Sequence, residues 1–158
     1  GAFLAGLNDG LSHLLERTNQ IIFASAIYGV IDLEAGELRV ASAGHPDPMI
    51  RREGRVMPLA LGETGRGAAL GMISGFEFQE VTEPLGGLES AWFFTDGVFE
   101  VLDEGGREFG VERMMEALEK GGDVGAALDH LVGEGSRFSA TGTFGDDVCL
   151  LGFQVSSQ

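Results

Sequence analysis

Residues 90–100 read Ser90-Ala91-Trp92-Phe93-Phe94-Thr95-Asp96-Gly97-Val98-Phe99-Glu100. From Ala91 to Thr95 every residue is apolar, aromatic or β-branched, which predicts a strand buried on both faces. The run then ends on an acid and a glycine. Gly97 favours a sharp backbone turn and leaves the Asp96 carboxylate uncovered, so Asp96 is a candidate ligand for a hard cation such as Mg²⁺ or Mn²⁺. An Asp-Gly pair by itself is also common turn chemistry.

Length and composition bound the class of protein. The chain has 158 residues, which fits one domain spanning 1–158, and its 26 glycines against 4 prolines favour a sheet-rich fold with many turns. A net charge of -15 argues against binding to nucleic acid or to an anionic membrane surface. No run reaches the roughly 20 apolar residues of a membrane span.

The single cysteine, Cys149, cannot form an internal disulfide, so we expect a reducing compartment, the cytoplasm. Because Cys149 stands in an apolar run, we expect it to be a small buried hydrophobe.

The first half of the chain predicts one helix and several strands. Apolar residues three or four apart predict an amphipathic helix over 3–15, with Asn8 and Ser12 on its polar side. Alternation and turn signals predict two hairpins and a further strand, over residues 21–33 with 38–43, 49–52 with 55–59, and 76–82. The glycine-rich residues 61–75 lack the Gly-Lys-Ser/Thr ending of a P-loop.

The second half predicts two helices and a last strand. Helical spacing of apolar residues marks 111–118 and 124–132, where His130 lies on the polar side without a visible partner, and residues 148–153 form a second buried strand. Asp146 and Asp147 stand at its N-terminal start. If this strand lies antiparallel and adjacent to the one ending before Asp96, the acids meet at one edge of the sheet. Carboxylates that close repel unless a cation lies between them, so the sequence predicts a metal site.

A series of short motifs extends this interpretation. In order, they are Phe23-Ala24-Ser25-Ala26, Ala43-Gly44-His45-Pro46, Leu70-Gly71, Thr95-Asp96-Gly97-Val98 with Glu100, Phe109-Gly110 and Gly145-Asp146-Asp147-Val148. The set resembles the metal-dependent serine/threonine phosphatases of the PPM type, and more narrowly their bacterial SpoIIE-like, RsbU-like branch.

That resemblance implies an α+β fold, an antiparallel β-sandwich flanked by helices, with two Mn²⁺ or Mg²⁺ ions at one end. By the same likeness Asp96 and Asp146 are metal ligands, and Asp147 and Gly97 support the site. The metals would activate a water that attacks the phosphorus of phosphoserine or phosphothreonine in line, without a covalent intermediate. The implied substrate is a small phosphorylated regulator of the anti-anti-sigma type.

Gly44 and His45 are supporting candidates. Gly44 is expected at a backbone position that must turn. His45, in a Gly-His-Pro turn, has two interpretations, a general acid or a structural turn histidine, and we favour the structural one.

The resemblance is incomplete at its start. Family members open with an Asp-x-x-Gly-Gly-like and then an Asp-x-x-Gly-His-Gly-like motif, and neither is present here. We therefore expect the chain to be the C-terminal two-thirds of the domain, to hold at most one cation weakly, and to have little activity alone. Sheet edges left open favour a homodimer or another covering association.

Two other functions are considered. One is a non-catalytic phosphatase-like protein-interaction module that has lost its metal. The other is an aspartate-nucleophile phosphatase of the haloacid dehalogenase type. That chemistry needs a second acid two residues after the nucleophile, and this chain has Val98 there, so the sequence argues against this type.

Overall fold

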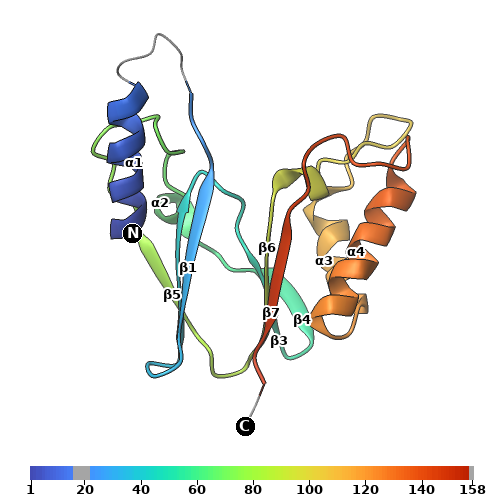
Figure 1. The fold of residues 1–158 in the computed structure, drawn as a ribbon. Helices are drawn as coiled ribbons and strands as arrows, with labels where there is room; N and C mark the ends of the chain where they lie inside the picture. Colours follow the sequence, from blue (N-terminus) through green and yellow to red (C-terminus); the bar gives the residue numbers. More distant parts are fainter. Residues whose placement is uncertain (16–21, 157–158) are drawn as a thin grey trace. The chain divides into compact units, whose positions relative to one another are not determined.

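The computed structural model describes residues 1–15 and 22–156 and shows antiparallel sheets together with helices, so the predicted α+β class is confirmed (Figure 1). Contacts divide the chain into two compact units, Gly1–Asp47 with Ala60–Gly86 and Pro48–Leu59 with Gly87–Gln158. Each unit has its own sheet and its own cluster of buried apolar side chains. Within the described residues, no helix combines the length and the apolar character needed to cross a bilayer.

The first unit contains a three-stranded antiparallel sheet in the order β1-β2-β5. Its elements are α1 (Ala2–Leu15), β1 (Ala26–Asp32), β2 (Glu37–Ala43), α2 (Gly62–Gly65) and β5 (Glu80–Pro84). The first predicted hairpin is confirmed as β1 and β2, although residue 21 of that prediction lies outside the described residues. The strand predicted over 76–82 starts only at Glu80, because Phe76 and Phe78 pack into the core beside Leu4 instead of pairing in the sheet.

Helix α1 is anchored by a polar residue, which corrects the predicted polar face. Asn8 and Ser12 are buried with Leu4, whereas Leu7 is exposed. The Asn8 Nδ2 donates to the Ile73 carbonyl at 2.9 Å, and its Oδ1 accepts from the Gly71 amide at 2.9 Å. The helix therefore holds the 71–73 loop through hydrogen bonds that an apolar count along the sequence does not detect.

The second unit contains a four-stranded antiparallel sheet in the order β4-β3-β6-β7. Its elements are β3 (Met49–Arg52), β4 (Arg55–Pro58), β6 (Leu88–Phe94), the 3₁₀ turn η1 (Asp96–Val98), α3 (Gly110–Lys120), α4 (Val124–Phe138) and β7 (Leu150–Gln154). The second predicted hairpin is confirmed as β3 and β4. The strand predicted before Asp96 is confirmed as β6, which lies between β3 and β7.

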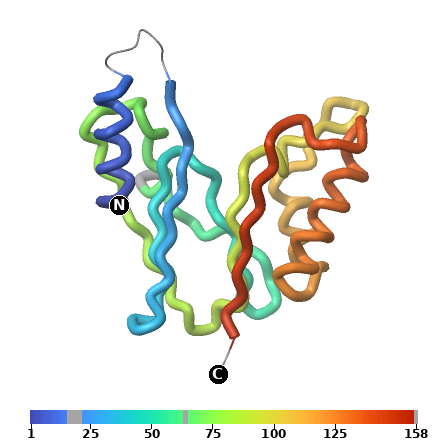
Figure 2. The backbone as a smooth tube through the Cα atoms, viewed as in Figure 1, coloured from blue at the N-terminus to red at the C-terminus, as the bar shows by residue number. Residues whose placement is uncertain are grey.

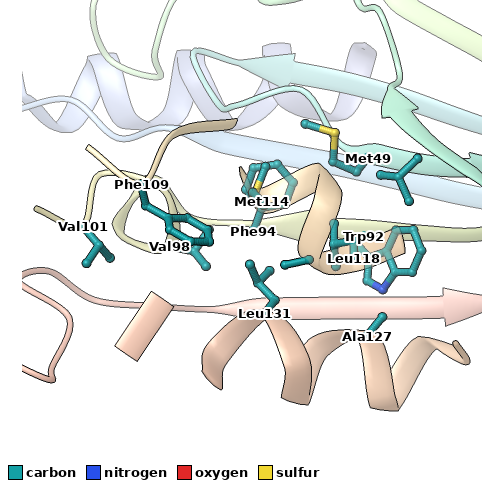
Figure 3. Close-up of a cluster of buried hydrophobic side chains, with 12 residues drawn as sticks. Met49, Trp92, Phe94, Val98, Val101, Phe109, Met114, Leu118, Ala127 and Leu131 are labelled. Atoms are coloured by element: carbon teal, nitrogen blue, oxygen red, sulfur yellow. The ribbon is translucent and has the colours of Figure 1, made fainter. Parts of the chain in front are cut away.

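The core of the second unit lies between this sheet and helices α3 and α4. Trp92 of β6 is fully buried, and so are Met114 and Leu118 of α3 and Leu131 of α4. Figure 3 shows these side chains gathered in one cluster. The cluster fixes β6, and with it the backbone position at which Asp96 follows the strand.

Both helices of this unit match their predicted positions. Asp123 caps α4, since its side chain accepts a hydrogen bond from the Ala126 amide at 2.9 Å. His130 has a partner that the sequence did not suggest, because its Nε2 lies 3.9 Å from Oε1 of Glu134, one helical turn away. This pair is ionic only when His130 is protonated.

Strand β7 is less buried than predicted. It is the last strand of its sheet in the order described, and Leu151 keeps 64% of its surface exposed. Cys149, just before it, is exposed, so the prediction of a buried thiol is wrong. An apolar run does not show whether a strand is central or lies at an edge. Among the strands of residues 1–15 and 22–156, only β6 pairs with β7.

Arg51 ties the sheet to the end of α3. Its guanidinium is buried, donates to the carbonyls of Gly122 and Leu118, and lies 5.1 Å from the centroid of the Trp92 ring. A cation at a helix C-terminus interacts favourably with the carbonyls left unpaired there. Arg51 therefore fixes α3 relative to the strands that lead to Asp96.

Candidate metal centre

The predicted adjacency of the two acid-bearing strands is confirmed. β6 and β7 are antiparallel neighbours, with Phe94 opposite Leu150, and Figure 2 shows the two segments running side by side. Asp96 comes two residues after β6 ends, and Asp146 comes four residues before β7 begins. Because the two strands are antiparallel, both acids lie beyond the same end of this strand pair.

The backbone at Gly97 lies close to the segment that contains Asp146 and Asp147. An added Cβ at Gly97 would lie 2.7 Å from the Asp147 carbonyl oxygen and 3.3 Å from the Asp146 Cβ. The backbone turns at Gly97 as predicted, because Gly97 lies in η1, but it has no positive φ, so this turn does not itself require glycine. It leaves room for residues 146 and 147 beside residue 97.

The acids differ in how their local backbone is fixed. Asp96 is exposed and starts η1, and its carbonyl accepts from the amides of Phe99 and Glu100, each at 3.0 Å. Asp146 is also exposed, and its Oδ1 accepts from the Asp147 amide at 2.7 Å. Asp147 is exposed too, and its carbonyl accepts from the Thr95 hydroxyl at 2.9 Å.

A cavity of about 390 Å³ opens beside Asp146 and Gly97. Its lining includes Gly97 and Asp146 together with the hydroxyl-bearing residues Ser139, Thr141 and Thr143. Its volume lies in the range of ligand-binding pockets. The sequence did not predict this cavity, and the small, polar composition of residues 139–145 is the signal that could have pointed to it.

The loop that lines this cavity is held by its own hydroxyl groups. Ser139 Oγ donates to the Thr143 carbonyl at 2.6 Å, and the hydroxyls of Thr141 and Thr143 lie 3.0 Å apart. The Ala140 amide donates to the Leu102 carbonyl at 3.0 Å, which joins the loop to the segment after η1. These bonds give the cavity wall a defined shape.

Gly44 and His45 belong to the first unit, where the structure shows a local turn. Gly44 has a φ of 68°, as expected for a position that must turn. The His45 amide donates to Ser42 Oγ at 3.1 Å, the Ser42 hydroxyl lies 3.1 Å from the His45 carbonyl, and His45 Nδ1 lies 3.4 Å from Ser25 Oγ. These contacts show how His45 is held locally, and its structural interpretation stays a prediction.

The chemistry of the donors suits a hard cation. Asp96 and Asp146 offer carboxylate oxygens, and Mg²⁺ is commonly held by one or two carboxylates with water completing its shell. Across residues 1–15 and 22–156, no three or more His, Cys, Asp and Glu side chains are grouped so that they could hold a metal ion. Asp96 and Asp146 are the two carboxylates whose chemistry suits such a cation, and their assignment as metal ligands stays a prediction.

Comparison with known proteins identifies the family. The model of the family described as Stage II sporulation protein E (SpoIIE) matches residues 1–156. The chain belongs to the SpoIIE family. Curated protein sequences give no significant match.

Solved structures agree with this membership. Over 98% of its length the chain is similar to the SiaA-PP2C domain of Pseudomonas aeruginosa, with a TM-score of 0.69, 18% identity and 70% of that chain covered. For the manganese-presoaked phosphatase domain of the cell fate determinant SpoIIE from Bacillus subtilis, the TM-score is 0.65 and the identity 21%, over 90% of this chain and 61% of that one. For the RsbU and RsbW domains of a Mycobacterium tuberculosis protein, the values are 0.67 and 22%, over 90% of this chain and 40% of that one.

At these identities the structural similarities establish the fold, that of PP2C-like phosphatase domains. The chain spans less than two thirds of the length of the second and third of these solved chains.

Proposed function

We propose that this chain carries part of the catalytic centre of a metal-dependent protein phosphatase that hydrolyses phosphoserine or phosphothreonine. The observation that carries the proposal is the approach of the Asp96 and Asp146 segments at the ends of adjacent antiparallel strands, beside a cavity. Membership of the SpoIIE family supports it.

In this proposal Asp96 and Asp146 hold one divalent cation, Mn²⁺ or Mg²⁺. When bound, the cation supplies positive charge to the phosphoryl oxygens and lowers the pKa of water. Asp147 orders the backbone beside Asp146, and Gly97 permits the close approach. The cavity next to Asp146 receives the substrate residues that flank the phosphorylated side chain.

The proposed substrate is a small phosphorylated regulatory protein of the anti-anti-sigma type, met in the cytoplasm. Support comes from the family and from the similarity to a solved chain that contains an RsbU and an RsbW domain. The single exposed cysteine is consistent with a reducing compartment.

Mn²⁺ binding to the 158-residue chain tests the site. Titration calorimetry of wild type, Asp96→Asn and Asp146→Asn is compared with Asp129→Asn, which removes the same charge from an exposed position on α4. We expect weak binding of one ion by wild type and by the Asp129 variant. Each of the other two variants should bind at least about tenfold more weakly, because one of two charged ligands is lost. Equal Mn²⁺ affinities in all four proteins would rule out the proposed site.

Turnover of a phosphoserine peptide is expected to be low in this chain, because two carboxylates are too few to hold the two metal ions of such a reaction. Robust Mn²⁺-dependent turnover by these 158 residues would contradict the expectation of low activity.

A second candidate is a non-catalytic phosphatase-like interaction module. It is favoured by the lack, among the described residues, of a group of three or more metal-ligating side chains. This alternative predicts that wild type binds a phosphorylated regulator with the same affinity in millimolar Mn²⁺ and in a chelator.

A further inference from the structure

The hydroxyl of Thr95 joins the two acid-bearing segments. It donates to the Asp147 carbonyl at 2.9 Å and accepts from the Cys149 amide at 2.9 Å. The Thr95 amide also donates to the Cys149 carbonyl at 3.1 Å. Three hydrogen bonds from one residue therefore hold the segment that contains Asp147 just beyond the last regular pair of β6 and β7.

The Thr95 hydroxyl accepts a hydrogen bond that a backbone carbonyl accepts in a regular antiparallel pair. In a hydrogen-bonded antiparallel pair, each residue both donates to and accepts from the other through its main chain. Here the Thr95 carbonyl accepts from the Val98 amide at 3.3 Å, as the start of η1 requires. The Thr95 hydroxyl replaces this carbonyl as the acceptor for Cys149, so the turn at Asp96 forms without releasing the neighbouring segment.

Residues on both sides of Asp96 contact the opposite segment. Thr95 holds it through hydrogen bonds, and Gly97 lies against it because it has no side chain. Asp96, between them, is exposed. The residues before and after Asp96 therefore hold the segment with Asp146 and Asp147 next to it.

We propose that Thr95 is a positioning residue whose hydroxyl sets the 146–149 segment against Asp96, so that both carboxylates can reach one divalent cation. The part that concerns the cation rests on the proposed function. The hydrogen-bonded groups lie at the surface, so water can replace the hydroxyl as their partner. Loss of the hydroxyl should therefore change the geometry of the site more than the stability of the fold.

Two substitutions separate the hydroxyl from the shape of the side chain. Thr95→Val keeps the branched shape and removes both hydroxyl bonds, whereas Thr95→Ser keeps the hydroxyl. Thr82→Val is the matched control, because Thr82 is exposed on β5 of the first unit.

The first measurement needs no metal. Amide hydrogen exchange of Cys149, followed by NMR in the 158-residue chain, should be faster in Thr95→Val by about tenfold, the size expected for one lost hydrogen bond. Thr95→Ser and Thr82→Val should exchange like wild type. Unchanged exchange at Cys149 in Thr95→Val would overturn the inference.

The second measurement is Mn²⁺ affinity by electron paramagnetic resonance. Thr95→Val should bind about tenfold more weakly, and Thr95→Ser within about twofold of wild type. Faster exchange at Cys149 with unchanged Mn²⁺ affinity would show that Thr95 only extends the pairing of β6 and β7. That result would also overturn the inference. Absence of Mn²⁺ binding in wild type counts against the proposed function, and the exchange at Cys149 then decides whether Thr95 holds the segment.

Discussion

Replacing Gly97 by alanine should separate the two acid-bearing segments. The new Cβ would lie 2.7 Å from the Asp147 carbonyl oxygen, whereas ordinary contact begins at 3.4 Å, so the backbone must move by about 0.7 Å. Overpacking of this kind costs about 1–3 kcal/mol. Alanine also lowers the backbone entropy of the unfolded chain, which offsets about 0.4–1 kcal/mol of this cost because Gly97 has no positive φ.

Gly145→Ala provides the control in the same site. No atom lies within 4 Å of an added Cβ at Gly145, and this residue also has no positive φ. The two variants share the entropy gain, so their difference in unfolding free energy isolates the steric cost, about 1–3 kcal/mol. For a chain of this length, each kcal/mol shifts the melting temperature by about 2–4 °C.

Urea unfolding, with amide chemical shifts of residues 146–149, measures both consequences. Gly97→Ala should be the less stable variant, with shifts displaced along that segment and weaker Mn²⁺ binding. The reasoning fails if Gly97→Ala is as stable as Gly145→Ala and leaves these shifts unchanged.

Three further outcomes are expected. Arg51→Met removes the buried guanidinium at the end of α3 and should lower the unfolding free energy, measured by urea unfolding, by about 2–3 kcal/mol. Arg55→Met is the control, because Arg55 is exposed, and it should leave the unfolding free energy unchanged. Asn8→Leu loses both loop hydrogen bonds and should cost about 1–3 kcal/mol, with faster exchange in the 71–73 loop; retained protection would contradict it. The Arg107 amide and then its side chain lower the pKa of Asp103; because the folded pKa is depressed, this stabilisation is present above the unfolded pKa and is lost as the pH falls through the folded one. An NMR titration of Asp103 in native and urea-unfolded protein checks this, and equal pKa values would refute it.

Local patterns predicted the elements that carry the acids. The apolar run before Asp96 and the hairpin turns are short-range signals, and the structure confirms β6 and the two predicted hairpins. The approach of Asp96 and Asp146 was predicted only on the condition that their strands pair, and the β6–β7 ladder meets it. The assignment of these acids as metal ligands stays a prediction.

Other features depended on partners far along the chain. Asn8 is buried because a loop more than sixty residues later supplies its hydrogen bonds, and Thr95 gains its function from Asp147 and Cys149. Cys149 was mistaken for a core residue because an apolar run does not report which face of an edge strand is covered. Such contacts are set by tertiary packing and leave no periodic signal.

The order β6, α3, α4, β7 has a consequence for the nascent chain. Helices and the loop joining them form from neighbouring residues in microseconds, whereas β7 must close a long excursion to reach β6. As the chain leaves the ribosome, Asp96 is therefore made well before its counterpart. Asp96 and Asp146 are therefore brought to the same end of the sheet only after β7 has paired with β6.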